Sequence, residues 1–187
     1  MARCLAMALT STVYSVAIDL SDIDRGVYES LDLRLAMHPS ESAEYLVTRL
    51  LAYCLEYAEG IEFTAGLSNG DEPAIVVRDL TGRIASWIEV GMPDADRLHR
   101  ASKLADRVAV YTHRDLRSVL GQLQGRKIHR ASAIPVCSFG RGFIDELAAN
   151  VQRRMRMSLS VTERHVYLDV DGHAMTTVME EHRLPDV

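Results

Sequence analysis

Alternation of apolar and polar positions near the start of the chain predicts two half-buried strands. Residues 14–20 and 31–35 carry an apolar side chain at every second position, which is the period of a strand with one buried face. We expect them to form a hairpin. His38-Pro39-Ser40 then ends the second strand, and a broad apolar stripe over residues 46–58 predicts a core helix with Ser40 as its N-cap.

The middle of the chain predicts a second hairpin followed by a crossover. Residues 75–77 and 84–90 have the composition of strands, and the turn-forming residues 79–82 join them. Asp94 is the expected N-cap of a helix, and the short apolar run 108–111 is typical of a buried parallel strand. Strand, helix and strand then make a right-handed crossover unit.

The last third predicts helices followed by strands. Residues 114–123 and 143–151 look helical, whereas residues 155–179 alternate in three short runs that predict an antiparallel β meander. The chain has no internal repeat, low-complexity tract or linker. We therefore expect one domain over residues 1–187, of the α/β (α+β) class, with a mixed β-sheet flanked by helices and a C-terminal meander.

Composition narrows the class of protein. The three cysteines are far apart and form no CxxC pair, which disfavours a disulfide framework and a structural zinc site. There is no signal-peptide pattern, and no apolar run approaches the ~18 residues that span a bilayer. We expect a cytoplasmic protein that does not enter the membrane. Because GxxxxGK[ST] and GxGxxG are absent from the sequence, we expect no nucleotide cofactor.

Charge is distributed unevenly along the chain. The net charge is −5, yet residues 97–160 hold 13 basic and 4 acidic residues, whereas residues 1–96 hold 6 basic and 16 acidic ones. A basic segment of this kind is either a phosphate-binding face or a solvated helix surface that pairs with acids. The helix after Asp94 is expected to carry a basic stripe formed by Arg97, Arg100, Lys103 and Arg107. On the first interpretation this stripe contacts DNA or RNA, and on the second it is a solvated helix surface.

Glu89 is the residue whose position most suggests chemistry. It lies near the C-terminal end of an expected strand that feeds a crossover helix, and ligands collect beyond such strand ends in open α/β sheets. Alternation places Trp87 and Gly91 on the same face of the strand as Glu89. A carboxylate in such an apolar segment needs either a divalent cation or an arginine as its partner, and spacing alone leaves both open.

Further acids are expected near Glu89. Glu41 and Glu44 fall in the first turns of the expected core helix, and Asp71-Glu72 precedes the strand that pairs with the strand of Glu89. Acids at a helix N-terminus are also favoured by the helix macrodipole alone. Asp71 and Glu72, which precede the expected strand over residues 75–77, can equally be solvated loop residues.

Short motifs over most of residues 10–115 resemble the YaeQ family. They are Ile23-Asp24-Arg25, His38-Pro39-Ser40-Glu41, Gly66-Leu67-Ser68, Asp71-Glu72-Pro73, Asp79-Leu80-Thr81-Gly82, Trp87-Ile88-Glu89-Val90-Gly91 and Pro93-Asp94. The resemblance implies a variant of the PD-(D/E)XK nuclease fold, in which metal-binding carboxylates lie at strand ends. It brings no settled activity; cleavage of nucleic acid is suggested by the fold.

The resemblance also implies roles for individual residues. Glu89 matches the acid of the (D/E)XK element, and Glu41 matches the acid of the first core helix. Gly91 stands where the motif has its lysine, so Lys103 on the following helix is the expected substitute, because a lysine can lose its proton when desolvated and an arginine cannot.

One position departs from the family pattern. Where many relatives read Glu-Pro-Asp, this chain reads Glu72-Pro73-Ala74, and an alanine cannot bind a metal. Either Glu72 or Asp71 supplies the missing ligand, or the protein keeps the fold without efficient catalysis.

Two hypotheses follow. The first is a Mg²⁺-dependent nuclease, with Mn²⁺ as a substitute, or a degraded relative of one; its catalytic residues are Glu41, Glu72, Glu89 and Lys103, and the three glutamates bind the metal. The second is a non-catalytic nucleic-acid- or protein-binding module in which the acids are ion-pair partners. Convergence of these side chains within one metal shell, ~4–6 Å, favours the first hypothesis.

Overall fold

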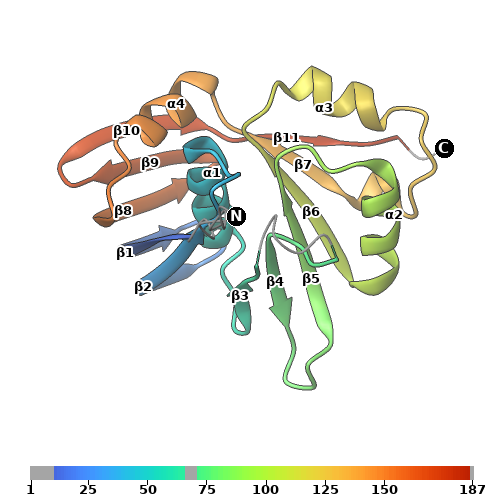
Figure 1. Cartoon of the computed structure of the whole chain (residues 1–187), viewed down its shortest axis with the longest axis horizontal. Coiled ribbons are helices and arrows are strands. Elements are labelled where there is room, and N and C mark those ends of the chain that lie inside the picture. Colours follow the sequence, from blue (N-terminus) through green and yellow to red (C-terminus); the bar gives the residue numbers. More distant parts are fainter. Residues whose placement is uncertain (1–10, 66–70, 186–187) are drawn as a thin grey trace, which may run out of the picture.

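A computed structural model describes residues 11–65 and 71–185 of the chain. The motif Gly66-Leu67-Ser68 lies outside these residues. The described chain forms two β-sheets and four α-helices, in agreement with the expected mixture of strands and core helices (Figure 1). The expectation of one mixed sheet has to be extended to two, because the first hairpin and the last strands build a sheet of their own.

The first sheet joins the two ends of the chain. Its order is β10-β9-β8-β1-β2. The strands are β1 (Thr12–Asp22), β2 (Val27–Met37), β8 (Arg154–Thr162), β9 (His165–Val170) and β10 (His173–Val178). The predicted hairpin β1–β2 and the predicted antiparallel meander β8–β9–β10 are both present. Parallel pairing of β1 with β8 connects them.

The second sheet contains the predicted second hairpin and the crossover. Its order is β11-β7-β6-β5-β4-β3. The strands are β3 (Ile61–Phe63), β4 (Ile75–Arg78), β5 (Ile84–Val90), β6 (Arg107–Thr112), β7 (Pro135–Ser138) and β11 (Glu180–Arg183). β4 and β5 pair antiparallel, whereas β5 and β6 pair in parallel across the helix that joins them. The C-termini of β5 and β6 therefore meet at one edge of the sheet.

The helices bury different amounts of their surface. They are α1 (Ala43–Leu55), α2 (Ala95–Leu104), α3 (Leu116–Leu123) and α4 (Arg141–Ala149), with a short 3-10 helix η2 (Ala131–Ala133). Helix α1 lies between the two sheets (Figure 1), and every residue from Tyr45 to Leu55 is buried. Helices α2 and α3 pack against β5, β6 and β7 in a second apolar cluster.

Two helix boundaries differ from those expected. The N-cap of α1 is Ser42 and not Ser40, because the Ser42 side chain accepts a hydrogen bond from the backbone N–H of Tyr45 at 3.2 Å. Glu41 therefore precedes the helix. Helix α2 ends at Leu104, where Ala105 turns to extended backbone, so Arg107 begins β6 and does not belong to the helical stripe. The predicted cap Asp94 is confirmed.

Among the described residues, no helix has the length and apolar character that crossing a membrane requires.

Candidate functional site

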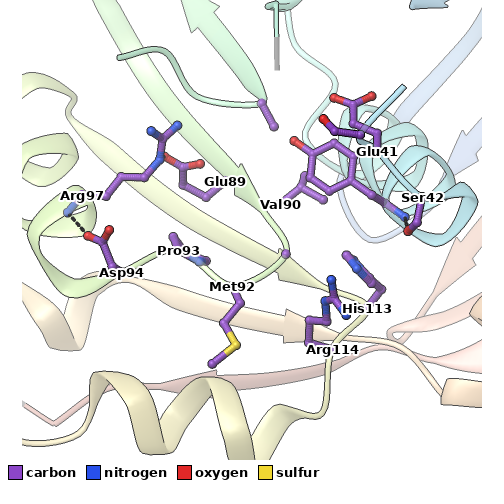
Figure 2. A pocket seen from close by; sticks show the side chains of 14 residues that line it. Glu41, Ser42, Glu89, Val90, Met92, Pro93, Asp94, Arg97, His113 and Arg114 are labelled. Atoms are coloured by element: carbon purple, nitrogen blue, oxygen red, sulfur yellow. Dashed lines mark hydrogen bonds and ion pairs between the residues drawn. The ribbon is translucent and has the colours of Figure 1, made fainter. Parts of the chain in front are cut away.

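A pocket of about 400 Å³ opens at the C-terminal end of β5. Its walls come from the turn before α1, the start of α2 and the segment after β6, so residues far apart in sequence meet there. Figure 2 shows Glu41 across the pocket from Glu89 and Arg97, with His113 and Arg114 at the lower right of the view, on the same side as Ser42.

Glu89 is paired with an arginine and a tryptophan. Its side chain is buried, and its Oε1 accepts hydrogen bonds from Trp87 Nε1 at 2.5 Å and from Arg97 Nε at 2.6 Å. The strand alternation of β5 puts Trp87 beside Glu89. Asp94 caps α2 by accepting from the backbone N–H of Arg97 at 2.7 Å, which fixes Arg97 in the first turn. Burial raises the pKa of Glu89, whereas the hydrogen bonds from Arg97 and Trp87 lower it.

Arg97 also connects the pocket to the segment before β4. Its guanidinium donates a second hydrogen bond to the backbone carbonyl of Glu72. One cation thus contacts both the carboxylate at the end of β5 and the chain that leads into the neighbouring strand. The sequence left two partners open for Glu89, a divalent cation and an arginine, and the structure shows the arginine.

Glu41 is buried on the opposite side of the pocket, and only one of its two carboxylate oxygens accepts a hydrogen bond from the described residues. Glu41 is 6% exposed, and its Oε2 accepts a hydrogen bond from the backbone N–H of His38 at 3.0 Å. Its Oε1 has no hydrogen-bond partner among the described residues. A buried carboxylate oxygen without a donor is costly to the stability of the fold.

Tyr45 and His113 lie next to each other in the wall of the pocket. Their rings meet edge to face, with centroids 6.2 Å apart. Burial raises the pKa of Tyr45 to about 12 and lowers the pKa of His113, so both side chains are uncharged at neutral pH. The His113 Nδ1 is buried and lacks a partner in the described part of the chain.

Comparison with known proteins identifies the family. The family described as "YaeQ protein" matches residues 7–179. The chain belongs to the YaeQ family. It is 31% identical over 163 residues to "Uncharacterized protein YaeQ" of Salmonella typhi, covering 87% of this chain and 90% of the relative. It is 30% identical over 171 residues to the protein of the same name from Escherichia coli (strain K12), covering 88% and 92%.

Crystal structures of YaeQ proteins have the same fold. The YaeQ protein from Pseudomonas syringae superposes with a TM-score of 0.83 at 33% identity, covering 91% of this chain and 95% of that one. The YaeQ protein from Xanthomonas axonopodis pv. citri superposes with a TM-score of 0.81 at 30% identity, covering 94% and 100%.

The residues that the YaeQ resemblance singled out are only partly brought together. Glu41 and Glu89 line one pocket. Glu72 is half-buried, does not line that pocket, and reaches Arg97 through its carbonyl. Lys103 is exposed near the far end of α2, six residues or ~9 Å of helix rise beyond Arg97. Among the predicted basic residues, only Arg97 lines the pocket.

Arg107 lies in a different environment from the other basic residues. It forms a bidentate ion pair with Glu56, with Nη1–Oε2 and Nη2–Oε1 distances of 2.5 and 2.8 Å, and Tyr111 donates to the same carboxylate at 2.8 Å. These residues line a second pocket, of about 460 Å³, together with Asp22 and Glu181. Arg107 is therefore a partner of α1 rather than a neighbour of Glu89.

The residues present do not fit a resident Mg²⁺ ion of the kind the YaeQ resemblance implies. Within residues 11–65 and 71–185, no three His, Cys, Asp or Glu side chains are placed to hold a metal ion together. Ala74 lines the pocket with a methyl group at the position where the YaeQ resemblance implies an aspartate, and Arg97 already binds Glu89. Binding of Mg²⁺ or Mn²⁺ stays a prediction.

Sequence reasoning missed Tyr45, His113 and Arg114. A signal for the last two was present, because they directly follow β6, the parallel neighbour of β5. The rule that singled out Glu89, that ligands collect beyond the carboxyl ends of such strands, applies to the segment after β6 as well.

Proposed function

We propose that this YaeQ-family protein is a non-catalytic nucleic-acid-binding module on a PD-(D/E)XK-like scaffold. The observation that carries the proposal is the buried ion pair between Arg97 and Glu89. An internal guanidinium neutralises the carboxylate that a nuclease of this fold would use for its metal. The pocket then presents fixed cationic and hydrogen-bonding groups to a ligand.

Basic residues near the pocket support an anionic ligand. Arg114 lines the pocket and is exposed, and Arg117 is exposed in the first turn of α3. Arg100 and Lys103 are exposed on α2. In the described part of the chain none of these four side chains forms an ion pair with an acid. Their charges are available for phosphate groups, unlike the charge of Arg107.

Binding of a labelled single-stranded oligonucleotide, measured by fluorescence anisotropy over a series of salt concentrations, tests the proposal. We expect affinity to fall steeply with salt, because phosphate contacts release counterions. Arg114→Gln should weaken binding and reduce the slope of log K against log salt by about 0.7, the value for one phosphate contact on a single strand. The matched control is Arg34→Gln, which replaces an exposed arginine on β2. This variant should leave the slope unchanged. Absence of binding at low salt contradicts the proposal.

A Mg²⁺-dependent nuclease is the second candidate. Two observations favour it: Glu41 and Glu89 line the same pocket, and the Oε1 of Glu41 is unpaired among the described residues. Incubation of DNA and RNA with the wild type and with Glu89→Gln, in Mg²⁺ or Mn²⁺, separates the candidates. Cleavage by the wild type that is lost in Glu89→Gln would replace the non-catalytic proposal by this one.

A further inference from the structure

We infer that two copies of this chain pair edge to edge through β2, antiparallel about a two-fold axis at Leu33, so that their first sheets join into one sheet. The same residues of each copy form such an isologous interface. The inference goes beyond nucleic-acid binding and does not depend on it, because no residue of β2 lines the pocket beside Glu89.

The edge of the first sheet at β2 is long and regular. β2 is the last strand in the order β10-β9-β8-β1-β2 (Figure 1), and among the described residues only β1 pairs with it. It contains no proline, and all eleven of its residues pair with β1 without a register shift. The other edge strands described, β3, β10 and β11, have three, six and four residues. Soluble proteins usually shorten, bulge or cover an edge of this length, so β2 is suited to pairing with another strand.

The backbone groups that β2 presents to this edge follow from the pairing of β1. The N–H of Ser15 in β1 donates to the carbonyl of Arg153, immediately before β8, at 2.8 Å. Since successive residues of a strand present their N–H and C=O groups to opposite sides, the even-numbered residues of β1 face β2 and pair there with its odd-numbered residues. The even-numbered residues of β2, from Tyr28 to Ala36, therefore direct their N–H and C=O groups to the open edge. These groups can form a ladder with a second strand.

The charges of β2 favour a second copy of the chain as the partner and set its register. Asp32 and Arg34 are exposed and form no ion pair among the described residues. When two β2 strands pair antiparallel about Leu33, Asp32 of each copy lies opposite the partner's Arg34. Both positions direct their backbone groups to the open edge, so each opposite-charge pair is also a hydrogen-bonded pair. An axis at Asp32 or at Arg34 places like charges directly opposite each other, which is destabilising.

The apolar face of β2 matches in the same register. Leu31, Leu33 and Met37 pack against the core but stay partly exposed, whereas Leu35 is fully buried. With the axis at Leu33, the two Leu33 side chains meet and Leu31 lies opposite the partner's Leu35. Pairing thus removes partly exposed leucine surface from water. Glu29, which shares this face, lies opposite the partner's Met37 at the end of the ladder and not opposite another acid.

Sedimentation velocity of the wild-type chain over a range of concentrations tests the inference. A contact between two edge strands is small for a specific interface, so we expect a dissociation constant of about 10 µM. The chain should then be mostly dimeric at about 100 µM and mostly monomeric at about 1 µM. A monomer at both concentrations overturns the inference, and this measurement depends on no variant.

Charge reversal then assigns the dimer to β2. Asp32→Arg places an arginine opposite the partner's Arg34 twice in each dimer, so the dissociation constant should rise at least about tenfold. The double variant Asp32→Arg/Arg34→Asp restores both opposite-charge pairs and should return the wild-type dissociation constant. Both side chains are exposed in the single chain, so neither variant disturbs the core. A dimer that Asp32→Arg leaves unchanged contradicts pairing through β2.

Cysteine variants test the register. At the axis the two Leu33 Cα atoms form a non-hydrogen-bonded pair about 4.5 Å apart, within the ~4.4–6.8 Å that a disulfide spans. Leu33→Cys should therefore give a covalent dimer in air, in a background of Cys4→Ser, because Cys54 and Cys137 are buried. Ser30→Cys in the same background is the control, since this exposed position lies opposite the partner's Ala36 and not its own counterpart. Equal cross-linking of the two variants overturns the register.

Discussion

Replacing Arg97 by methionine is expected to lower the free energy of unfolding by about 3 kcal/mol, the lower end of the cost of breaking a buried ion pair. The side chain of Glu89 is 5% exposed and that of Arg97 is 20% exposed. Methionine keeps the packing of the stem but leaves the carboxylate without its cation. Urea denaturation followed by circular dichroism measures the loss.

The double variant Glu89→Gln/Arg97→Met is the control. It removes both charges, so it should regain most of the lost stability. If the double variant is as unstable as Arg97→Met, the loss comes from packing of α2 and not from an uncompensated charge.

The effect of Arg97→Met should also depend on pH. Burial raises the pKa of Glu89 above its ordinary value of 4.5, and Arg97 opposes that rise. Without Arg97 the folded protein binds this proton more tightly than the unfolded chain does. The loss of stability is therefore fully present above the folded-state pKa and shrinks as the pH falls toward 4.5. A loss that is constant over this range would show that the carboxylate of Glu89 is not its cause.

The substitution Ala74→Asp is expected to create a metal-binding site. Ala74 is 3% exposed and lines the pocket with Glu41 and Glu89. Without metal, a third buried carboxylate should cost roughly 2 kcal/mol of stability. With Mn²⁺ or Mg²⁺ at 100 times its dissociation constant, binding should return about 2.7 kcal/mol. The melting temperature of the variant should then rise with metal concentration.

The wild type and Ala74→Asn are the matched controls for this experiment. Neither adds a carboxylate, so neither should show a comparable rise in melting temperature with metal. A metal-dependent rise in the wild type equal to that of Ala74→Asp would mean that the existing side chains already form the site, in favour of the Mg²⁺-dependent nuclease.

The local elements of the fold were predictable because each depends on near neighbours in sequence. The hairpins, the crossover through α2 and the meander follow from alternation, turn residues and the cap at Asp94. The pairing of β1 with β8 was not predicted, because alternation sets the period of a strand and not its partner. β11 was also missed, since Glu180–Arg183 has no apolar alternation.

The candidate site was predictable in part for the same reason. Glu89 was placed correctly because its strand and its crossover helix are contiguous in sequence. Its partner could not be chosen from spacing, since Arg97 and a metal ion both satisfy a buried carboxylate. Tyr45 approaches His113 only after α1 packs against the second sheet, and such contacts are invisible in a linear pattern.

The parallel pairing of β1 with β8 has a consequence for synthesis on the ribosome. Strand β1 pairs with residues 154–161, whereas the residues that line the pocket beside Glu89 lie between 40 and 114. The pocket walls thus emerge long before the first sheet can close. During that interval β8 has not yet been translated, so one edge of β1 has no strand to pair with and the apolar face of its hairpin is uncovered. Unpaired strand edges promote aggregation. Chains terminated before residue 154 will therefore be released with that edge permanently open.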